Sequence, residues 1–164
     1  MNQDTTDNLQ IRFATIDDTP LILDFIRELA EYERMLDKVV ATEELLRKWL
    51  FEKEKAEVLI GELNGEPVAF SLFFHNFSTF LARPGIYLED LFVRPEARGK
   101  GIGKKMLKYL AKLTVERDCG RLEWACLNWN TSSIEFYLSL GTEVMSDWTV
   151  YRVSGDILLK LAKE

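Results

Sequence analysis

Apolar and polar residues follow two different periods along this chain, and the helical period dominates its first third. Apolar residues recur every three or four positions after Asp17 and Asp18, which predicts a helix capped by these residues and ending near Tyr32. The same period from Thr42 to about Leu50 predicts a second amphipathic helix. A short strand is expected ahead of both helices, at 11–15.

The strand period takes over in the middle of the chain. The apolar runs 58–63 and 67–74 flank Asn64-Gly65, whose two residues both tolerate positive φ, so this region is expected to form a β-hairpin. The elements expected further on are a loop at 76–84, a strand at 87–93, a helix from about Gly101 to Glu116, a strand at 121–128, a helix at 132–140, and strands at 143–145 and 148–153. This order predicts an α/β fold with a mixed sheet and helices on both faces.

Length and composition favour one globular domain. The chain has 164 residues and 47% hydrophobic content, which is enough to bury a core. No apolar run approaches the length of a membrane helix, and the polar opening MNQDTTDNLQ lacks the pattern of a signal peptide, so we expect a cytoplasmic protein with no membrane partner. The net charge of -6 argues against nucleic acid as a partner and suits a cationic small substrate.

The cysteine content gives no support for a metal site. Cys119 and Cys126 lack the spacing of metal ligands, and His75 is the single histidine of the chain. We therefore expect no metal, and we interpret the cysteines as buried, reduced thiols.

A loop rich in glycine and positive charge, Arg98-Gly-Lys-Gly-Ile-Gly103, ends where the third helical period begins. The N–H groups of such a loop and of the first helical turn point outward together, and this array binds phosphate. The loop is not a Walker P-loop, because the Gly-Lys-Ser/Thr ending is absent, and Met106 replaces the third glycine of a Rossmann fingerprint. A plain turn is the alternative, and a pyrophosphate such as that of coenzyme A is the ligand favoured by the loop's cations.

Two carboxylates, Glu89 and Asp90, interrupt the apolar strand before this loop. Strand alternation predicts that Glu89 shares a face with Tyr87, Leu91 and Val93, whereas Leu88, Asp90 and Phe92 share the other. A glutamate on the first face could take a proton from an ammonium group, which is mostly charged at neutral pH. Glu89 is therefore the candidate base, with an edge carboxylate paired to a basic neighbour as the alternative. Asp90 is expected to support the fold or a loop.

The run from Val93 to Gly103 resembles the acetyl-CoA signature of the GNAT family of N-acetyltransferases, in which Arg or Gln is followed by two residues, Gly, one residue, and Gly or Ala. Arg98, Gly101 and Gly103 occupy its defining positions. Other segments that resemble the diamine acetyltransferase subfamily (spermidine/spermine and thialysine N-acetyltransferases) are Glu28–Glu33, Tyr87–Asp90, Leu127–Asn130, Phe136-Tyr137 and Trp148. The segment between Phe77 and Gly85 departs from that subfamily, which bears on the substrate rather than on the fold.

The resemblance implies a single-domain GNAT fold whose mixed, mostly antiparallel central sheet is splayed at a bulge, with helices on both faces. It assigns residues 1–9 to a flexible N-terminus and 10–164 to the N-acetyltransferase domain. The pantetheine of acetyl-CoA would pair with the freed backbone of the strand, and the Val93 N–H would polarise the thioester carbonyl. The implied cofactor-binding residues are Leu91, Phe92, Val93, Arg98, Gly99, Lys100, Gly101, Ile102, Gly103, Lys104, Asn130, Ser132 and Tyr137.

The resemblance also implies roles at the reacting centre. Tyr137 would protonate the departing thiolate, and its alternative is a core or rim aromatic; Asn130 alternatively is a plain helix cap. Tyr32 and Glu33 would line the amine pocket together with Glu89, and a solvated helix end is the alternative for the first two.

These observations predict an acetyl-CoA-dependent N-acetyltransferase that acts on a small primary amine, such as a diamine, polyamine or lysine-like compound. The alternatives are a peptide N-terminal or aminoglycoside acetyltransferase and a non-catalytic acyl-CoA-binding module. We also expect a homodimer that buries the strands at 148–153 and part of the first helices near Tyr32. In a monomer, a C-terminal helix at 156–163 would cover that sheet edge instead.

Overall fold

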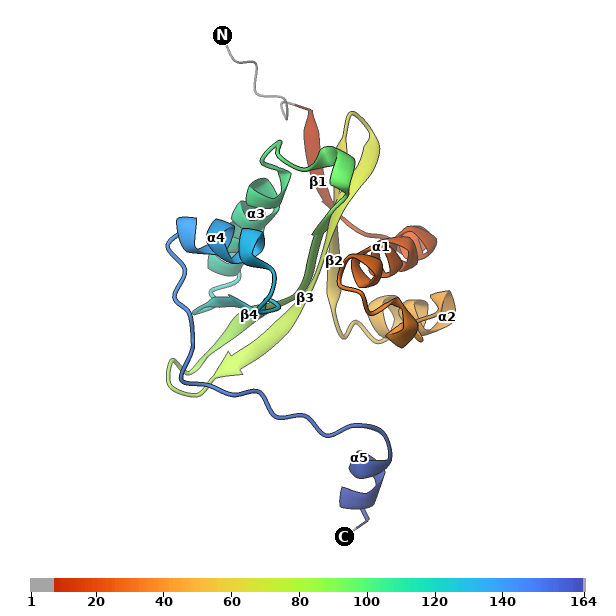
Figure 1. The fold of residues 1–164 in the computed structure, drawn as a ribbon, viewed down its shortest axis with the longest axis vertical. Coiled ribbons are helices and arrows are strands. Elements are labelled where there is room, and N and C mark those ends of the chain that lie inside the picture. The colour runs from red at the N-terminus through yellow and green to blue at the C-terminus, as the bar shows by residue number, and fades with distance from the viewer. Residues whose placement is uncertain (1–7, 164) are drawn as a thin grey trace. The chain divides into compact units, whose positions relative to one another are not determined.

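A five-stranded sheet is the centre of the fold in this computed structural model, which describes residues 8–163 (Figure 1). In spatial order its strands are β1 (Leu9–Phe13), β2 (Glu57–Leu63), β3 (Glu66–Ser78), β4 (Arg83–Val93) and β5 (Leu122–Trp124). All neighbours are antiparallel except β4 and β5, which are parallel. The expected mixed, mostly antiparallel sheet is thereby confirmed. Of the residues assigned to a flexible N-terminus, 1–7 lie outside the described residues.

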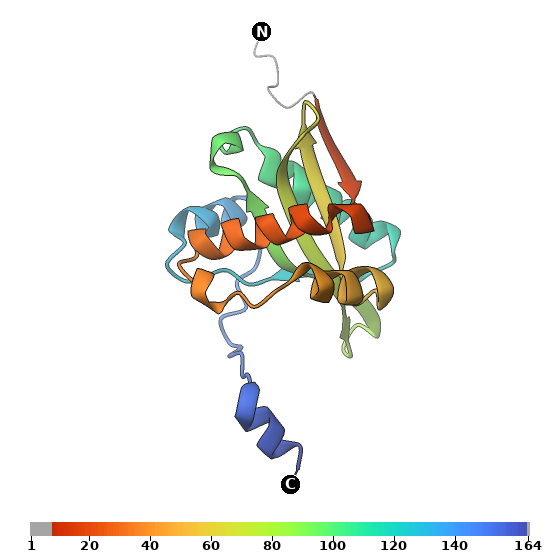
Figure 2. The ribbon, with the colours of Figure 1, turned by 90° about the vertical axis from the view of Figure 1, so that its right-hand side faces the viewer.

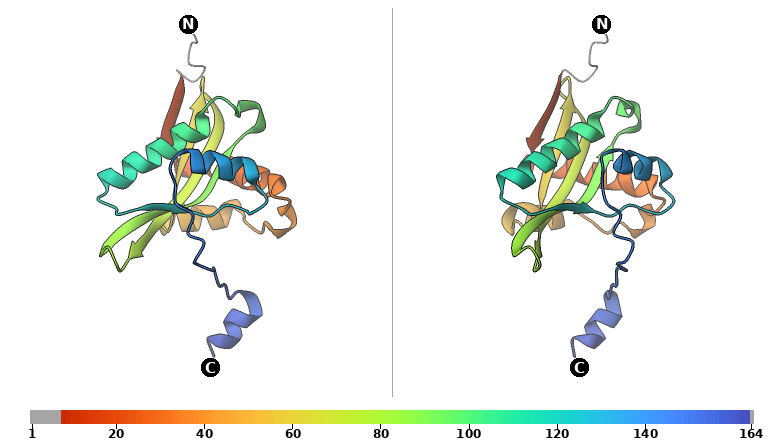
Figure 3. Two further views of the ribbon diagram at one scale, coloured as in Figure 1. Left: turned by 60° about the vertical axis from the view of Figure 1, so that its left-hand side comes forward. Right: turned by 90° about the vertical axis from the view of Figure 1, so that its left-hand side faces the viewer.

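Helices cover both faces of this sheet, as predicted. On one face lie α1 (Thr19–Tyr32) and α2 (Glu43–Leu46), the latter continued by a π-helical segment, Arg47–Glu52 (Figure 2). On the other face lies α3 (Ile102–Glu116) (Figure 3). A hydrophobic cluster joins the sheet to α1 and the π-helical segment, and its members are Ile22, Phe25, Leu50, Val58, Ile60, Phe70 and Phe92. The sheet residues of this cluster therefore lie on the face covered by α1.

The two hairpins of the sheet bear out one prediction and correct another. Asn64 and Gly65 both have positive φ, 54° and 83°, so the predicted turn between β2 and β3 is confirmed. The loop expected at 76–84 is wrong for most of its length, because the ladder between β3 and β4 continues to the pair Ser78 and Arg83. The strands extend this far because they hydrogen-bond to one another, and the pattern of apolar and polar side chains does not predict where such pairing ends.

The chain divides into two compact units, one ending at Ala125 and the other beginning at Cys126. The second unit contains α4 (Thr131–Ser139) and α5 (Gly155–Leu161). The strands expected at 143–145 and 148–153 are not formed within the described chain. Apolar alternation indicates an extended segment, but a strand also needs a partner for its backbone hydrogen bonds.

The sequence interpretation of the cysteines needs one correction. Cys119 and Cys126 form no disulfide, as expected, but they are half-buried rather than buried. Separately, none of the helices formed by residues 8–163 has the length and apolar character required to cross a membrane.

Candidate active site

A β-bulge at Glu89 sets the geometry of the site. Asp90 lies opposite Leu72 of β3, and Leu88 lies opposite Phe73, so Glu89 is an extra residue without a partner in the ladder. Leu72 packs against the hydrophobic cluster beneath α1. The ring of Phe73 instead lies 5.8 Å from the guanidinium carbon of Arg117, at the end of α3. Asp90 therefore belongs to the face covered by α1, and Leu88 belongs to the opposite face.

This bulge corrects the predicted alternation along β4. Simple alternation put Leu88, Asp90 and Phe92 on one face, and this is wrong for Leu88 because the extra residue reverses the phase of the strand. Asp90 and Phe92 remain together on the α1 face, since Phe92 belongs to the cluster beneath that helix. The sequence interpretation assigned Asp90 to the scaffold and missed it as a site residue. Two adjacent carboxylates in an apolar strand were the signal that could have identified it.

The carboxylates around the bulge influence one another. The pKa of Asp90 is raised to about 6, first by burial and then by the negative charges of Glu89 and Glu33. Burial also raises the pKa of Glu33. Glu89 itself is exposed. Asp90 is therefore a carboxylate whose protonation changes near pH 6.

Tyr32 and Glu33 are positioned by the end of α1. The helix ends after Tyr32 because Arg34 adopts a left-handed conformation with a φ of 60°. The backbone N–H of Met35 then donates to the Ala30 carbonyl oxygen at 2.8 Å and closes the final turn. Both Tyr32 and Glu33 are half-buried, and the carboxylate of Glu33 acts electrostatically on Asp90. The predicted amine-binding residues and the bulge thus share one region.

Within residues 8–163, no strand pairs with the β5-side edge of β4 beyond the bulge. The pairing with β5 ends at Leu88 and Trp124. On the β3 side, the Arg94 N–H donates to the Val68 carbonyl oxygen at 2.9 Å. Because hydrogen bonding alternates along an antiparallel ladder, Leu91 and Val93 direct their N–H and C=O groups toward the opposite edge. This edge can pair with an extended, amide-containing ligand.

The glycine-rich loop follows this edge. Gly99 and Gly101 have φ values of 75° and 77°, a conformation that favours glycine, and Gly101 immediately precedes α3. A Cβ atom on Gly103 would meet Val93 Cγ2 at an ordinary 3.8 Å. The first backbone N–H groups of α3, those of Ile102, Gly103 and Lys104, have no partner within the helix. Lys100 and Lys104 are exposed. The loop can therefore offer both backbone N–H donors and positively charged side chains to a phosphate.

The second unit carries the other predicted residues. Asn130 caps α4, because its side-chain oxygen accepts a hydrogen bond from the Ser133 N–H at 3.4 Å. The Ser132 hydroxyl lies 3.5 Å from the same oxygen. Tyr137 is half-buried on α4, and its ring centroid is 5.4 Å from that of Phe136. The capping role of Asn130 is thereby confirmed.

Residues 8–163 contain no group of three His, Cys, Asp or Glu side chains arranged to hold a metal ion. The site combines an open strand edge, a glycine-rich loop at the N-terminus of a helix, and a group of carboxylates. This combination defines the class of protein as a coenzyme A-dependent acyltransferase. The model of the acetyltransferase (GNAT) family matches residues 23–142. The chain therefore belongs to the GNAT acetyltransferase family.

Individual relatives agree with this assignment. The chain is 37% identical to a thialysine N-epsilon-acetyltransferase of Bos taurus, and the match covers 94% of this chain and 97% of that protein. It is 32% identical to an L-ornithine N5-acetyltransferase of Arabidopsis thaliana, over 94% of this chain and 88% of that protein. An integron cassette protein from the mobile metagenome of V. cholerae has a similar solved structure, with a TM-score of 0.81 and 30% identity over 96% of this chain and 99% of that one.

Proposed function

We propose that this acetyltransferase transfers the acetyl group of acetyl-CoA to a primary amine of a small molecule that carries a second cationic centre. Diamines, polyamines and lysine-like or ornithine-like compounds have this chemistry. The observation that carries the proposal is the opening of the β4 edge beyond Leu88, directly beside the carboxylates Glu33, Glu89 and Asp90. The relatives named for thialysine and ornithine acetylation support the same substrate class.

The β4 edge and the glycine-rich loop are proposed to bind acetyl-CoA. Leu91 and Val93 supply backbone groups for the pantetheine, and the Val93 N–H is directed toward the edge where it can polarise a thioester carbonyl. Gly99 to Lys104 supply backbone donors and cations for the pyrophosphate. Asn130, Ser132 and Tyr137 complete the proposed cofactor contacts.

The carboxylates are proposed to bind and deprotonate the amine. An ammonium group must lose a proton before it can attack a thioester, because its lone pair is otherwise occupied. Glu89 is proposed as the base, as the sequence predicts, and Asp90, whose pKa is raised to about 6, is proposed as a second proton acceptor. Glu33 and Tyr32 are proposed to bind the acceptor, since a carboxylate and an aromatic face both attract a cation. Tyr137 is proposed to donate a proton to the departing thiolate.

The direct test is acetyl transfer from acetyl-CoA to a panel of amines, monitored by release of the coenzyme A thiol. The panel contains diamines, polyamines, lysine, ornithine, a peptide with a free N-terminus and an aminoglycoside. The expected result is the highest kcat/KM with a compound from the first four groups. Faster acetylation of the peptide or the aminoglycoside would contradict the proposed substrate class. Acetyl-CoA binding without thiol release for any amine would identify a non-catalytic binding module.

We further propose a homodimer, on the basis of the second unit taken by itself. Its final segment exposes large apolar side chains, including Trp148 at 73%, Val150 at 85% and Tyr151 at 91% exposure. Contiguous apolar surface of this kind typically marks a protein interface. A cytoplasmic location is also proposed, because Cys119 and Cys126 form no disulfide, which suits a reducing compartment.

A further inference from the structure

Two arginines that follow β4 contact α1 at successive turns. Arg94 donates from Nε and Nη2 to the two carboxylate oxygens of Glu28, at 3.0 and 2.8 Å. Four residues later in each segment, the guanidinium carbon of Arg98 lies 4.6 Å from the ring centroid of Tyr32. Residues four apart on a helix share one face, so the spacing of the two arginines matches the turn of α1. The segment that leads into the glycine-rich loop is thus joined to the helix that carries the proposed amine-binding residues.

Arg98 contacts the proposed cofactor edge at the same time. Its Nε donates a hydrogen bond to the Val93 carbonyl oxygen at 2.8 Å. Its guanidinium carbon is also 5.4 Å from the ring centroid of Phe92. The flat guanidinium group can stack on aromatic rings while its edge donates hydrogen bonds, and a lysine cannot do both. One side chain therefore restrains the backbone at Val93 and the ring of Tyr32.

We propose that Arg98 is a positioning residue that couples the acceptor end of α1 to the cofactor edge of β4. This inference rests on the proposed function and gives Arg98 a role beyond contact with the pyrophosphate. A carbonyl held by Arg98 limits the rotation of the Val93 backbone, whose N–H faces the thioester. The same guanidinium group fixes the ring of Tyr32 on the amine side. Coupling between two binding sites is reciprocal. A substitution at Tyr32 therefore changes the affinity for acetyl-CoA, and a substitution at Arg98 changes the affinity for the amine.

The first experiment needs no turnover. Acetyl-CoA affinity is measured by calorimetry for the wild type, Tyr32→Leu, Arg98→Lys and the double variant, after unfolding curves have shown that each is folded. Tyr32→Leu is expected to weaken acetyl-CoA binding about three-fold when Arg98 is present, in line with the size of an exposed cation–π contact. The same substitution is expected to have no effect in the Arg98→Lys protein, because the coupling group is already lost.

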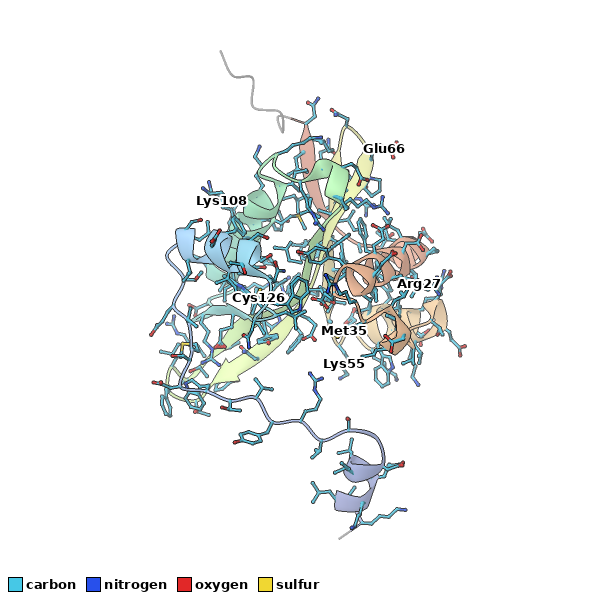
Figure 4. The ribbon with its side chains drawn as sticks, viewed as in Figure 1. Arg27, Met35, Lys55, Glu66, Lys108 and Cys126 are labelled. Atoms are coloured by element: carbon cyan, nitrogen blue, oxygen red, sulfur yellow. The ribbon has the colours of Figure 1, made fainter. Side chains whose placement is uncertain are left out.

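Two control variants separate coupling from general damage. Tyr32→Phe keeps the aromatic ring and is expected to bind acetyl-CoA like the wild type. Arg27→Gln removes a positive charge from the exposed side of the same helix (Figure 4) and is expected to change neither ligand's affinity.

The second experiment uses the best amine at saturating acetyl-CoA. Arg98→Lys is expected to lower kcat/KM for the amine about ten-fold although the cofactor site is full, with a contribution from an increased amine KM. Wild-type amine kinetics under this condition would overturn the proposal and leave Arg98 as a phosphate contact only. Equal acetyl-CoA affinities of the wild type and Tyr32→Leu would also overturn it. If the wild type acetylates no amine, the proposed function fails, and the calorimetric cycle still decides the coupling.

Discussion

Asp90 lies opposite Leu72 on the α1 face of the sheet, one residue after a bulge that reverses the phase of β4. This relationship brings a half-buried carboxylate to the face where Glu33 ends α1. Ordinary alternation would also have placed Leu88 on that face, whereas the bulge places it on the face of α3. A carboxylate whose pKa is near 6 can accept a proton at neutral pH, so the bulge bears directly on the proposed chemistry.

The first prediction identifies the base. If Asp90 accepts the proton, the kcat/KM of the wild type should rise with pH as Asp90 ionises, with an apparent pKa near 6. Asp90→Asn should remove this limb and lower activity at neutral pH by roughly 10²-fold, the size typical of a general base. Glu89→Gln is the matched comparison, because it removes the neighbouring carboxylate. If Glu89 is the base, its variant should instead recover activity as rising pH deprotonates the amine, and a uniform loss at every pH would indicate a binding role.

A second prediction concerns stability. The folded-state pKa of Asp90 is above its ordinary value of 3.8, so the folded protein binds this proton more tightly than the unfolded chain does. Ionised Asp90 therefore costs stability, and this cost grows as pH rises from about 4 to about 6 and then stays constant. Asp90→Asn should raise the free energy of unfolding by about 2 to 3 kcal/mol at pH 7.5 and by little at pH 4. Urea unfolding at both pH values measures the difference, and an equal effect at both would contradict the raised pKa.

The third prediction tests the phosphate loop. Gly101→Val places a branched side chain at a φ of 77° just before α3, so the loop must change its conformation. Calorimetry should show loss of coenzyme A binding by this variant, with the protein still folded by circular dichroism. Gly65→Ala is a matched control, because it also substitutes a positive-φ glycine, in the β2–β3 turn. An unchanged coenzyme A affinity of Gly101→Val would exclude the loop as the pyrophosphate site.

The fourth prediction concerns the leaving group. Tyr137→Phe retains the ring and removes the hydroxyl proton, so turnover should fall by roughly 10²-fold or more while acetyl-CoA affinity changes little. Phe136→Leu, which alters the adjacent ring of α4, controls for damage to packing. Near-normal turnover of Tyr137→Phe would support the alternative of a structural aromatic.

The fifth prediction concerns assembly. Light scattering at micromolar concentration should give about twice the 19.0 kDa mass of one chain. Charged substitutions at the exposed Trp148 and Val150 should shift the protein toward the monomer, because each would place a charge in the proposed interface. A single-chain mass for the wild type would contradict the homodimer and any contribution of a partner subunit to the amine pocket.

The sequence by itself determined the elements whose formation depends on local chemistry. The Asn64-Gly65 turn, the end of α1 near Tyr32 and the start of α3 after Gly101 were all predicted, because backbone conformation and helical spacing are properties of neighbouring residues. The glycine-rich loop and the family resemblance could be recognised for the same reason, because both depend on short runs of neighbouring residues. Family membership is confirmed.

The tertiary structure decided what depends on pairing between distant segments. The bulge at Glu89 exists only because β4 pairs with β3. It places Leu88 on the opposite face from the one that alternation predicts, and it leaves Asp90 close enough to Glu33 for their charges to interact. The stacking of Arg98 on Tyr32 likewise joins residues far apart in the chain. In the second unit, alternation predicted strands at 143–145 and 148–153 that do not form there. A strand exists only where another backbone accepts and donates its hydrogen bonds, and the order of side chains does not say where that backbone lies.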